Sequence, residues 1–501
     1  MADLNQTLIA SIDQGSSNSR LLLYTVKDWK PIFIKKVGLE TLYPNDGWCE
    51  QDPMVILNTV KRLLIAAYQF LQDNAASKYR LVALGITNQR ETVVAWDKAT
   101  GNPLYNAILW NDSRTQGIVD ELIGSSPGGK FQFKEICGLP ISTYFSAGKI
   151  RWLLDNQEEV QAASTEGRLM VGTVDTWLIW NLTGNRSYVT DVTNASRTML
   201  MNLKTLEWDT QLCTVFGIDR NSLAKICSST GMFGKLSYQN CPFKDVPITA
   251  CLGDQQAALV GQRCFKEGMA KNTLGTGTFM LYNVGENVIY SKQGLLTTVA
   301  YQFGKDAKPV YALEASIGGA GDAVQCLINM DFLKNAHELE ACAKTVKDNG
   351  GIYFVPAFNG LLAPYWRPNA QSIITGITLN TQKGHFCRAT IEALAFQTLE
   401  VLNRIQLDSR LELKAILVDG GMSNNDLLMQ TLANILGIDV IRSEIVERTA
   451  FGAALAAAFP LGLWSFDSDP IPGAITTFRP TMDKSVRDEK FRHWEEVIRK
   501  C

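Results

Sequence analysis

The 501-residue chain lacks the cysteine and histidine patterns that mark metal sites and disulfide-rich proteins. Its 11 cysteines include no C-x-x-C pair, so the sequence gives neither a zinc motif nor a disulfide framework. Its three histidines, His337, His385 and His493, do not lie at metal-ligand spacing, and we interpret each as structural. We therefore expect reduced thiols and no zinc site.

Blocks of like charge, a basic leader and long apolar runs are also missing. The net charge of -2 is spread evenly, which argues against a nucleic-acid partner or a polybasic membrane anchor. The start of the chain has no basic region, so a signal peptide is not expected. The most apolar stretch noted, residues 450–464, is too short to cross a bilayer and contains Pro460, which predicts no transmembrane segment. A cytoplasmic location is expected, with peripheral mitochondrial association left open.

Three familiar phosphate-binding motifs are absent. The sequence contains no G-x-x-x-x-G-K-[ST], no H-R-D catalytic loop and no G-x-G-x-x-G. This excludes the P-loop and protein-kinase routes to phosphoryl transfer. Phosphate binding, if present, would have to use other turns.

What the chain does contain is an alternation of short β-branched runs with longer helical patterns. A hydrophobic content of 46% is enough for large buried cores in two or more domains. The alternation predicts an α/β architecture. The predicted strands are residues 81–87, 168–174, 247–253, 353–358 and 415–421, and the two longest predicted helices are 54–72 and 385–405.

Residues 8–26, "LIASIDQGSSNSRLLLYTV", place small polar residues between two apolar strands. The middle predicts a tight hairpin turn, whose backbone N–H groups, hydroxyls and guanidinium suit phosphate oxygens. A solvated hairpin is the alternative. Residues 270–284, "AKNTLGTGTFMLYNV", repeat the pattern with a Gly/Thr turn. We therefore predict two domains, 1–262 and 263–501, each beginning with a hairpin that faces one shared cleft.

Arg90 and Glu91 lie at the polar end of the strand predicted at 81–87. There they could reach into a cleft and hydrogen-bond a hydroxylated ligand, although an ordinary surface ion pair is the alternative. Trp110 and Tyr144, in "AILWNDSRT" and "STYFSAGK", could line the same cleft or simply belong to the core.

Asp254 and Gln255 follow a strand and Gly253, directly before an apolar helix. A carboxylate at this place can accept a hydroxyl proton, and a helix cap is the alternative role. In the second hairpin, Thr276 lies between two glycines and Phe279 offers an apolar wall. Glycines also precede helical patterns in residues 315–325 and 418–430, as a nucleotide cleft requires.

Ten blocks occur in order along the chain: "DQGSSNSR", "GWCEQDP", "GITNQRET", "YFSAGKIRWLLDN", "GTVDTWLIWNLTG", "TDVTNASRTML", "GDQQAALVGQ", "GLLTTVAY", "VPAFNGLLAPYW" and "VDGGMSNND". Together they closely resemble the glycerol kinases of the sugar-kinase family. The resemblance runs essentially from end to end. It implies two ribonuclease H-like (actin-like ATPase) domains flanking a deep cleft, and Mg²⁺-dependent transfer of phosphate from ATP to glycerol.

The resemblance also implies roles for individual residues. The glycerol contacts would be Arg90, Glu91, Trp110, Tyr144, Asp254, Gln255 and Phe279, with Asp254 as general base. The nucleotide contacts would be Ser16, Ser17, Asn18, Arg20, Thr276, Gly321, Gln325, Gly421 and Asn425. Asp13 would lie near Mg²⁺, through water.

The sequence departs from the family pattern at Leu274, Cys326 and Ile328, close to the nucleotide side. None of these departures removes a predicted hydroxyl-binding residue. The alternatives are a related kinase for a larger polyol or sugar, a low-activity binding protein of the same fold, and an actin- or chaperone-like ATPase. A homodimer or homotetramer is expected.

Overall fold

Two large sheets, each built from strands of one half of the chain, organise the protein. The computed structural model describes residues 4, 6–74, 78–275, 277–317, 320–358, 360–445, 447–468 and 474–501. The first sheet runs in the order β11 (Thr230–Lys235), β12 (Pro247–Gly253), β5 (Arg80–Asn88), β1 (Thr7–Gln14), β2 (Asn18–Thr25), β3 (Pro31–Gly38). The second runs β15 (Leu296–Tyr301), β16 (Val310–Ile317), β14 (Thr278–Gly285), β13 (Ala270–Leu274), β19 (Ala415–Asp419), β20 (Asp439–Ser443), β21 (Ile475–Phe478).

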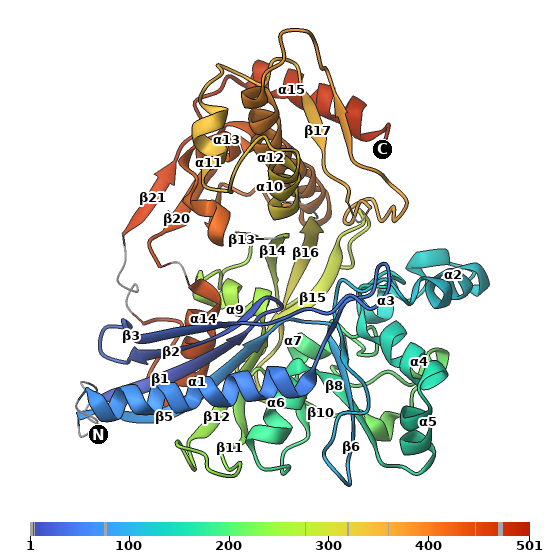
Figure 1. The fold of residues 1–501 in the computed structure, drawn as a ribbon, viewed down its shortest axis with the longest axis vertical. Helices are drawn as coiled ribbons and strands as arrows, with labels where there is room; N and C mark the ends of the chain where they lie inside the picture. Colours follow the sequence, from blue (N-terminus) through green and yellow to red (C-terminus); the bar gives the residue numbers. More distant parts are fainter. Residues whose placement is uncertain are drawn as a thin grey trace.

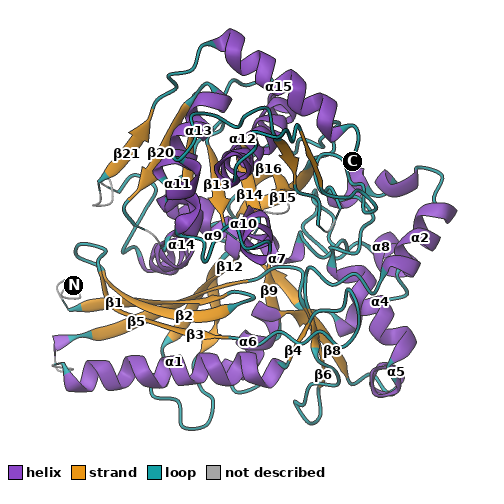
Figure 2. Cartoon of the chain, turned by 45° about the horizontal axis from the view of Figure 1, so that its top comes forward, coloured by secondary structure: helices purple, strands orange, loops and turns teal. Residues whose placement is uncertain are grey.

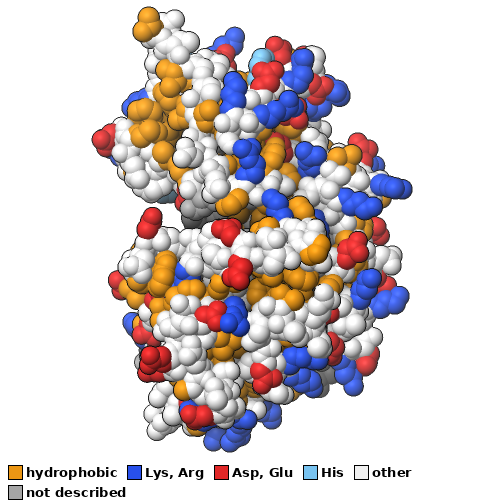
Figure 3. Space-filling model, turned by 90° about the vertical axis from the view of Figure 1, so that its right-hand side faces the viewer, with side chains coloured by type: hydrophobic (Ala, Val, Ile, Leu, Met, Phe, Trp, Pro, Cys, Tyr) orange, Lys and Arg blue, Asp and Glu red, His pale blue; other side chains and the backbone are white. Residues whose placement is uncertain are grey.

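The two sheets share the same core pattern. In the first, β1 forms an antiparallel hairpin with β2 and pairs in parallel with β5. In the second, β13 forms an antiparallel hairpin with β14 and pairs in parallel with β19. Both predicted hairpins are therefore present. Figure 1 shows the two sheets one above the other, and Figure 3 shows a notch between the upper and lower halves of the surface.

The remaining elements cover these sheets or extend them. A four-stranded sheet extends the first half in the order β4 (Glu50–Gln51), β7 (Ala107–Ile108), β6 (Val93–Asp97), β8 (Leu169–Thr173). The two-stranded sheets are β9 (Val189–Asp191) with β10 (Lys225–Cys227) and β17 (Tyr353–Val355) with β18 (Ile373–Thr375). The other helices are α2 (Gln116–Ser125), α3 (Lys134–Cys137), α4 (Ser146–Asn156), α5 (Glu158–Thr165), α6 (Val174–Leu182), α7 (Val192–Ala195), α8 (Thr210–Val215), α10 (Ala320–Asn329), α11 (Glu338–Ala343), α12 (Lys383–Ser409), α13 (Asp426–Leu436) and α15 (Lys484–Ile498).

The predicted strands and long helices are confirmed. β12 has the predicted bounds, and β5 and α12 extend the predicted ranges by a few residues at their ends. β17 stops at Val355, shorter than the predicted 353–358, because Pro356 has no N–H to donate to a strand partner. The α/β class follows from these local signals.

Strand β1 is buried along its whole length because helices cover both faces of its sheet. Leu8, Ala10 and Ile12 point into one core, which α1 (Pro53–Asp73) completes. Ile9 points into the opposite core, which contains α9 (Asp254–Gly261) and α14 (Arg448–Ala458). This alternation is the two-residue period of a strand. Figure 2 shows α1 running along the outer face of the sheet.

Helix α1 is the one described helix that is long and apolar enough to cross a membrane. Asp52 caps it by accepting the N–H of Met54 at 2.7 Å, and Pro53 occupies its first turn. Its buried residues Ile56, Leu63 and Leu64 pack against the first sheet. This is the contact pattern of a helix that covers a sheet.

Helix α14 comes from the last part of the sequence but packs on the first sheet. In Figure 1 it lies beside the N-terminal strands, below the rest of the C-terminal half. A Cβ atom on Gly452 would lie 1.8 Å from the carbonyl oxygen of Ala257, so α9 and α14 meet backbone to backbone. Only glycine allows this approach. The sequence boundary predicted at residue 262 stays a prediction, and α14 crosses back over it in space.

Candidate functional site

A cavity of about 160 Å³ lies where the ends of β5 and β12 meet the hairpin β13–β14. We call it the acceptor cavity. It is lined by Ser16, Gln89, Arg90, Glu91, Trp110, Tyr144, Asp254, Gln255, Thr273, Gly275, Gly277 and Phe279. All seven residues predicted to bind the acceptor alcohol therefore line one cavity, together with Ser16 of the first hairpin turn. Their individual roles stay predictions.

Arg90 and Glu91 sit in a strained turn between β5 and β6. The backbone of Glu91 has φ +61°, and the N–H of Thr92 donates to the carbonyl oxygen of Arg90 at 2.7 Å. Positive φ is uncommon for a non-glycine residue and is enriched at functional sites. Arg90 and Glu91 are only 3% and 2% exposed, so the alternative of a surface ion pair is wrong.

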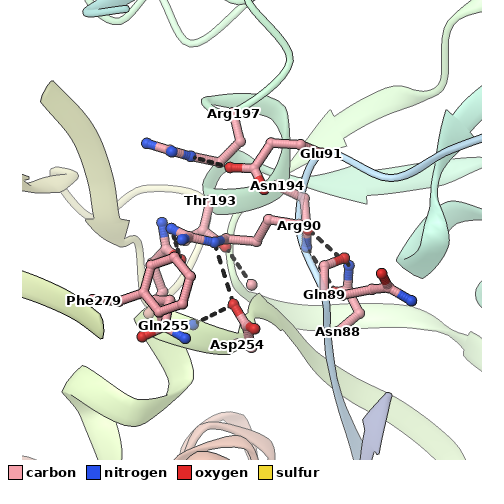
Figure 4. Close-up of polar contacts among 12 residues, drawn as sticks. Asn88, Gln89, Arg90, Glu91, Thr193, Asn194, Arg197, Asp254, Gln255 and Phe279 are labelled. Carbon is pink, nitrogen blue, oxygen red and sulfur yellow. Dashed lines mark hydrogen bonds and ion pairs between the residues drawn. The ribbon is translucent and has the colours of Figure 1, made fainter. Parts of the chain in front are cut away.

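The guanidinium of Arg90 joins the acceptor cavity to the core. Its Nε lies 3.2 Å from Oδ1 of Asp254, and its two Nη atoms each donate at 2.7 Å to the carboxylate of Glu314. Figure 4 shows the guanidinium of Arg90 beside the ring of Phe279, with the ion pair to Asp254 drawn as a dashed line. A Cβ atom on Gly253 would lie 2.6 Å from Cδ of Arg90, which explains the glycine before Asp254.

Asp254 is the first residue of α9, and its carboxylate faces the acceptor cavity. Gly253 occupies the N-cap position, so Asp254 is not the cap residue itself. Its side chain is 27% exposed and accepts the N–H of Gln255 at 2.7 Å. Burial raises the pKa of Asp254 above its usual range, while Arg90 and Lys271 lower it. A carboxylate with a raised pKa that is still open to the cavity is suited to accept a hydroxyl proton.

Three aromatic rings from three separate segments of the chain line the cavity. The ring of Trp110 lies 5.6 Å from that of Tyr144 and 6.0 Å from that of Phe279, edge to face in both cases. The backbone around Tyr144 is held by Lys149, whose ammonium donates to the carbonyl oxygens of Thr143 and Tyr144 at 2.8 and 2.7 Å. A short carbon chain can pack among these rings while its hydroxyls turn to the polar side.

The second half of the chain supplies polar residues that the sequence did not single out. Lys271 on β13 is fully buried and donates to Oε1 of Gln255 and, at 2.8 Å, to the hydroxyl of Thr273. Burial lowers the pKa of Lys271 to about 8. Glu314 on β16 holds Arg90. The first half adds one more such residue, Arg197 after α7, which donates to Glu91 at 2.7 Å (Figure 4). For Lys271 and Glu314 the available signal was a single charged residue inside an otherwise uncharged strand.

The first hairpin turn is tight, and its role in phosphate binding stays a prediction. The N–H of Gly15 donates to the carbonyl oxygen of Asn18 at 2.9 Å, which closes the turn and exposes Ser17. The Nε of Arg20 lies 3.4 Å from Asp13 and donates to the Asn18 side chain at 3.2 Å. The Nη1 of Arg20 also contacts Glu447, just before α14. Thr276, predicted for the second turn, lies outside the described residues.

The other predicted nucleotide residues lie on α10 or follow β19, and they are not among the residues that line the acceptor cavity. Gly321 and Gln325 lie on α10, and Gly421 begins a short 3₁₀ turn after β19. Asn425 caps α13 by accepting the N–H of Leu428 at 2.8 Å. The turn at Gly420 has φ +89°, and a Cβ there would lie 2.4 Å from the carbonyl oxygen of Leu274. This turn therefore packs against the second hairpin.

Comparisons with known proteins agree with this geometry. The N-terminal domain of the FGGY family of carbohydrate kinases matches residues 8–261, and its C-terminal domain matches residues 270–461. A glycerol kinase of Chloroflexus aggregans is 46% identical over 98% of this chain and 97% of its own. The crystal structure of Plasmodium falciparum glycerol kinase with ADP superposes with a TM-score of 0.91 at 37% identity, covering 99% of this chain and 98% of its own. A xylulose kinase of Lactobacillus acidophilus, 20% identical, shares the fold with a TM-score of 0.83 over 98% of this chain and 97% of its own.

Proposed function

This chain belongs to the FGGY family of carbohydrate kinases, and from that premise we propose that it transfers the γ-phosphoryl group of ATP to glycerol, giving sn-glycerol 3-phosphate and ADP. One observation carries the proposal. Asp254 faces a small cavity that Arg90, Glu91, Trp110 and Phe279 also line. The curated relatives named glycerol kinase, 42–46% identical over nearly the whole chain, favour the same acceptor.

In the proposed reaction, Asp254 takes the proton of the primary hydroxyl as its oxygen attacks the γ-phosphorus. The bond from this phosphorus to the β,γ-bridging oxygen breaks, and the electron pair leaves with ADP. Arg90 and Glu91 orient the alcohol, so that its oxygen lies in line with the leaving group. Closure of the two halves would exclude water, which would otherwise compete as acceptor.

The residues present fit a bound Mg²⁺ near the first hairpin turn. Asp13 is a buried carboxylate whose pKa burial raises to about 6, with Arg20 opposing this shift. Among the described residues, Arg20 is its one ion-pair partner, so Asp13 retains oxygen lone pairs for a cation or its waters. When bound, Mg²⁺ would neutralise charge on the β- and γ-phosphate oxygens.

The proposal is tested by a coupled ADP-release assay of the purified protein with Mg-ATP and a panel of polyols and ketoses. We expect glycerol to be the preferred acceptor, because three bulky rings leave little room for a longer chain. Faster turnover with xylulose or ribitol would show that glycerol is not the preferred acceptor and that the enzyme acts on a larger polyol or ketose. No turnover with any acceptor, despite ATP binding, would indicate a binding protein.

Replacing Phe279 by Ala should relax the preference for glycerol over a four- or five-carbon polyol by about 1–3 kcal/mol, the scale for apolar pocket changes. The reason is that Phe279 forms one wall of the cavity against Trp110. The ratio of kcat/KM values for glycerol and erythritol measures this effect. An unchanged ratio would remove Phe279 from acceptor selection.

Arg20→Ala is expected to weaken ATP binding more than glycerol binding. Arg20 lies beside the first hairpin turn and is not among the residues that line the acceptor cavity. Loss of one charge-assisted contact to phosphate should cost about 1.5–3 kcal/mol. Calorimetric titration of each ligand separately measures the difference, and an equal loss for both ligands would place this turn away from the nucleotide.

A further inference from the structure

Strand β16 carries one carboxylate in the middle of an otherwise uncharged sequence, VYALEASI. This residue, Glu314, is fully buried, with Leu281 of β14 and Leu296 of β15 as its neighbours in the sheet. A buried charge is costly unless it is paired and hydrogen-bonded. The position therefore requires an explanation beyond the packing of the sheet.

Glu314 is paired with two arginines of the other half of the chain. Its two oxygens accept from Nη2 and Nη1 of Arg90 at 2.7 Å each, and Oε2 also lies 3.5 Å from Nη1 of Arg197. Burial raises the pKa of Glu314, but Arg197 and Arg90 outweigh this and lower it to about 2. The group is therefore a carboxylate at every working pH.

The two-oxygen contact fixes the guanidinium plane of Arg90. An arginine side chain has several rotatable bonds, and a bidentate carboxylate selects one orientation of its planar group. With both Nη atoms held by Glu314 and Nη1 also near Gln256 at 3.2 Å, the Nε edge faces Asp254. Nε has no hydrogen-bond partner among the described residues, so its contact with Asp254 is an ion pair only.

We propose that Glu314 is a positioning residue of the acceptor site, which fixes the Arg90 guanidinium so that Arg90 can hold Asp254 and an acceptor hydroxyl in the orientation needed for transfer. This inference rests on the proposed function. Glu314 lies 224 residues from Arg90 in the sequence and belongs to the second sheet. Acceptor binding by the first half of the chain thus depends on a side chain of the second half.

The sharpest test is Glu314→Asp, which keeps the charge but draws the carboxylate back by one methylene. A displacement of about 1 Å in a positioning group can cost up to 10²-fold, so we expect the KM and the calorimetric Kd for glycerol to rise about 10- to 100-fold. The KM for ATP should change less than about threefold, because Glu314 does not contact the first hairpin turn. Glu314→Gln, which keeps the length and loses the charge, should show the same split.

The matched control is Glu392→Asp. Glu392 is a buried carboxylate of α12 whose two oxygens each accept from Lys490 at 3.1 Å, on α15 and away from the cavity. It should lose stability comparably but keep the wild-type KM for glycerol. Melting temperatures of all variants separate folding from positioning.

A folded Glu314→Asp protein with wild-type affinity for glycerol would overturn the inference. So would an equal rise of the KM for ATP and for glycerol, because a merely structural role would affect both. Failure of the proposed function has a different signature, since wild-type protein would then show no transfer to glycerol at all.

Discussion

An Asp254→Asn variant is expected to bind Mg-ATP and glycerol but to transfer the phosphoryl group about 10²- to 10⁴-fold more slowly, or roughly 3–5 kcal/mol in activation free energy. The amide is nearly isosteric with the carboxylate. It can accept a hydrogen bond from the acceptor hydroxyl, but it cannot take the proton. Turnover measured beside calorimetric binding of each substrate tests this expectation.

The structure adds an expected loss of stability to the loss of turnover in Asp254→Asn. Asp254 is ion-paired to Nε of Arg90, so the neutral amide also leaves one edge of a buried guanidinium without its counter-charge. Some loss of stability is therefore expected as well. Glu392→Asp, away from the cavity, shows how much turnover changes when stability alone is reduced. Near wild-type turnover in a folded Asp254→Asn protein would remove Asp254 from the mechanism.

A loose phosphoryl transition state would reduce the need for a base, because little of the new P–O bond has formed and little positive charge develops on the attacking hydroxyl. In that case the fall in the rate of phosphoryl transfer by Asp254→Asn lies at the lower end of the expected range. The helix-cap alternative for Asp254 no longer applies, because Gly253 occupies the N-cap position of α9.

Gly452→Ala is expected to destabilise the protein by about 3 kcal/mol, at the upper end of the usual cost of overpacking. The added methyl group would lie 1.8 Å from the carbonyl oxygen of Ala257 and 2.7 Å from the backbone nitrogen of Gly261. Both neighbours are backbone atoms and cannot rotate away. Helices α9 and α14 must therefore separate, which moves the helix that begins at Asp254.

The matched control is the same substitution at Gly124 in α2, where an added Cβ meets no atom within 4 Å. There, alanine should stabilise the helix by about 0.5–1 kcal/mol, because glycine is a poor helix former. Both expectations are tested by measuring thermal and denaturant unfolding of the two variants, together with the kcat of each. A Gly452→Ala protein as stable as Gly124→Ala would contradict the close contact between α9 and α14.

The acceptor candidates could be predicted because local signals place them. Arg90 follows β5, and Asp254 follows β12, which pairs in parallel with β5 so that Gly253 is opposite Asn88. Polar residues after neighbouring parallel strands come together at one edge of a sheet. The two hairpins could also be predicted from local signals, since each needs only two apolar runs on either side of a turn.

The sequence by itself thus determined the α/β class, the two hairpins and the residues at the carboxyl ends of the strands, because periodicity and turn chemistry act over a few residues. Only the tertiary structure decided that Arg90 is buried and that α14 packs on the first sheet. It also decided that two residues of the second half contact the acceptor site, Glu314 at Arg90 and Lys271 at Gln255. These contacts join residues far apart in the chain. Their pairing depends on how two separately formed sheets pack, and no local pattern in the sequence records that arrangement.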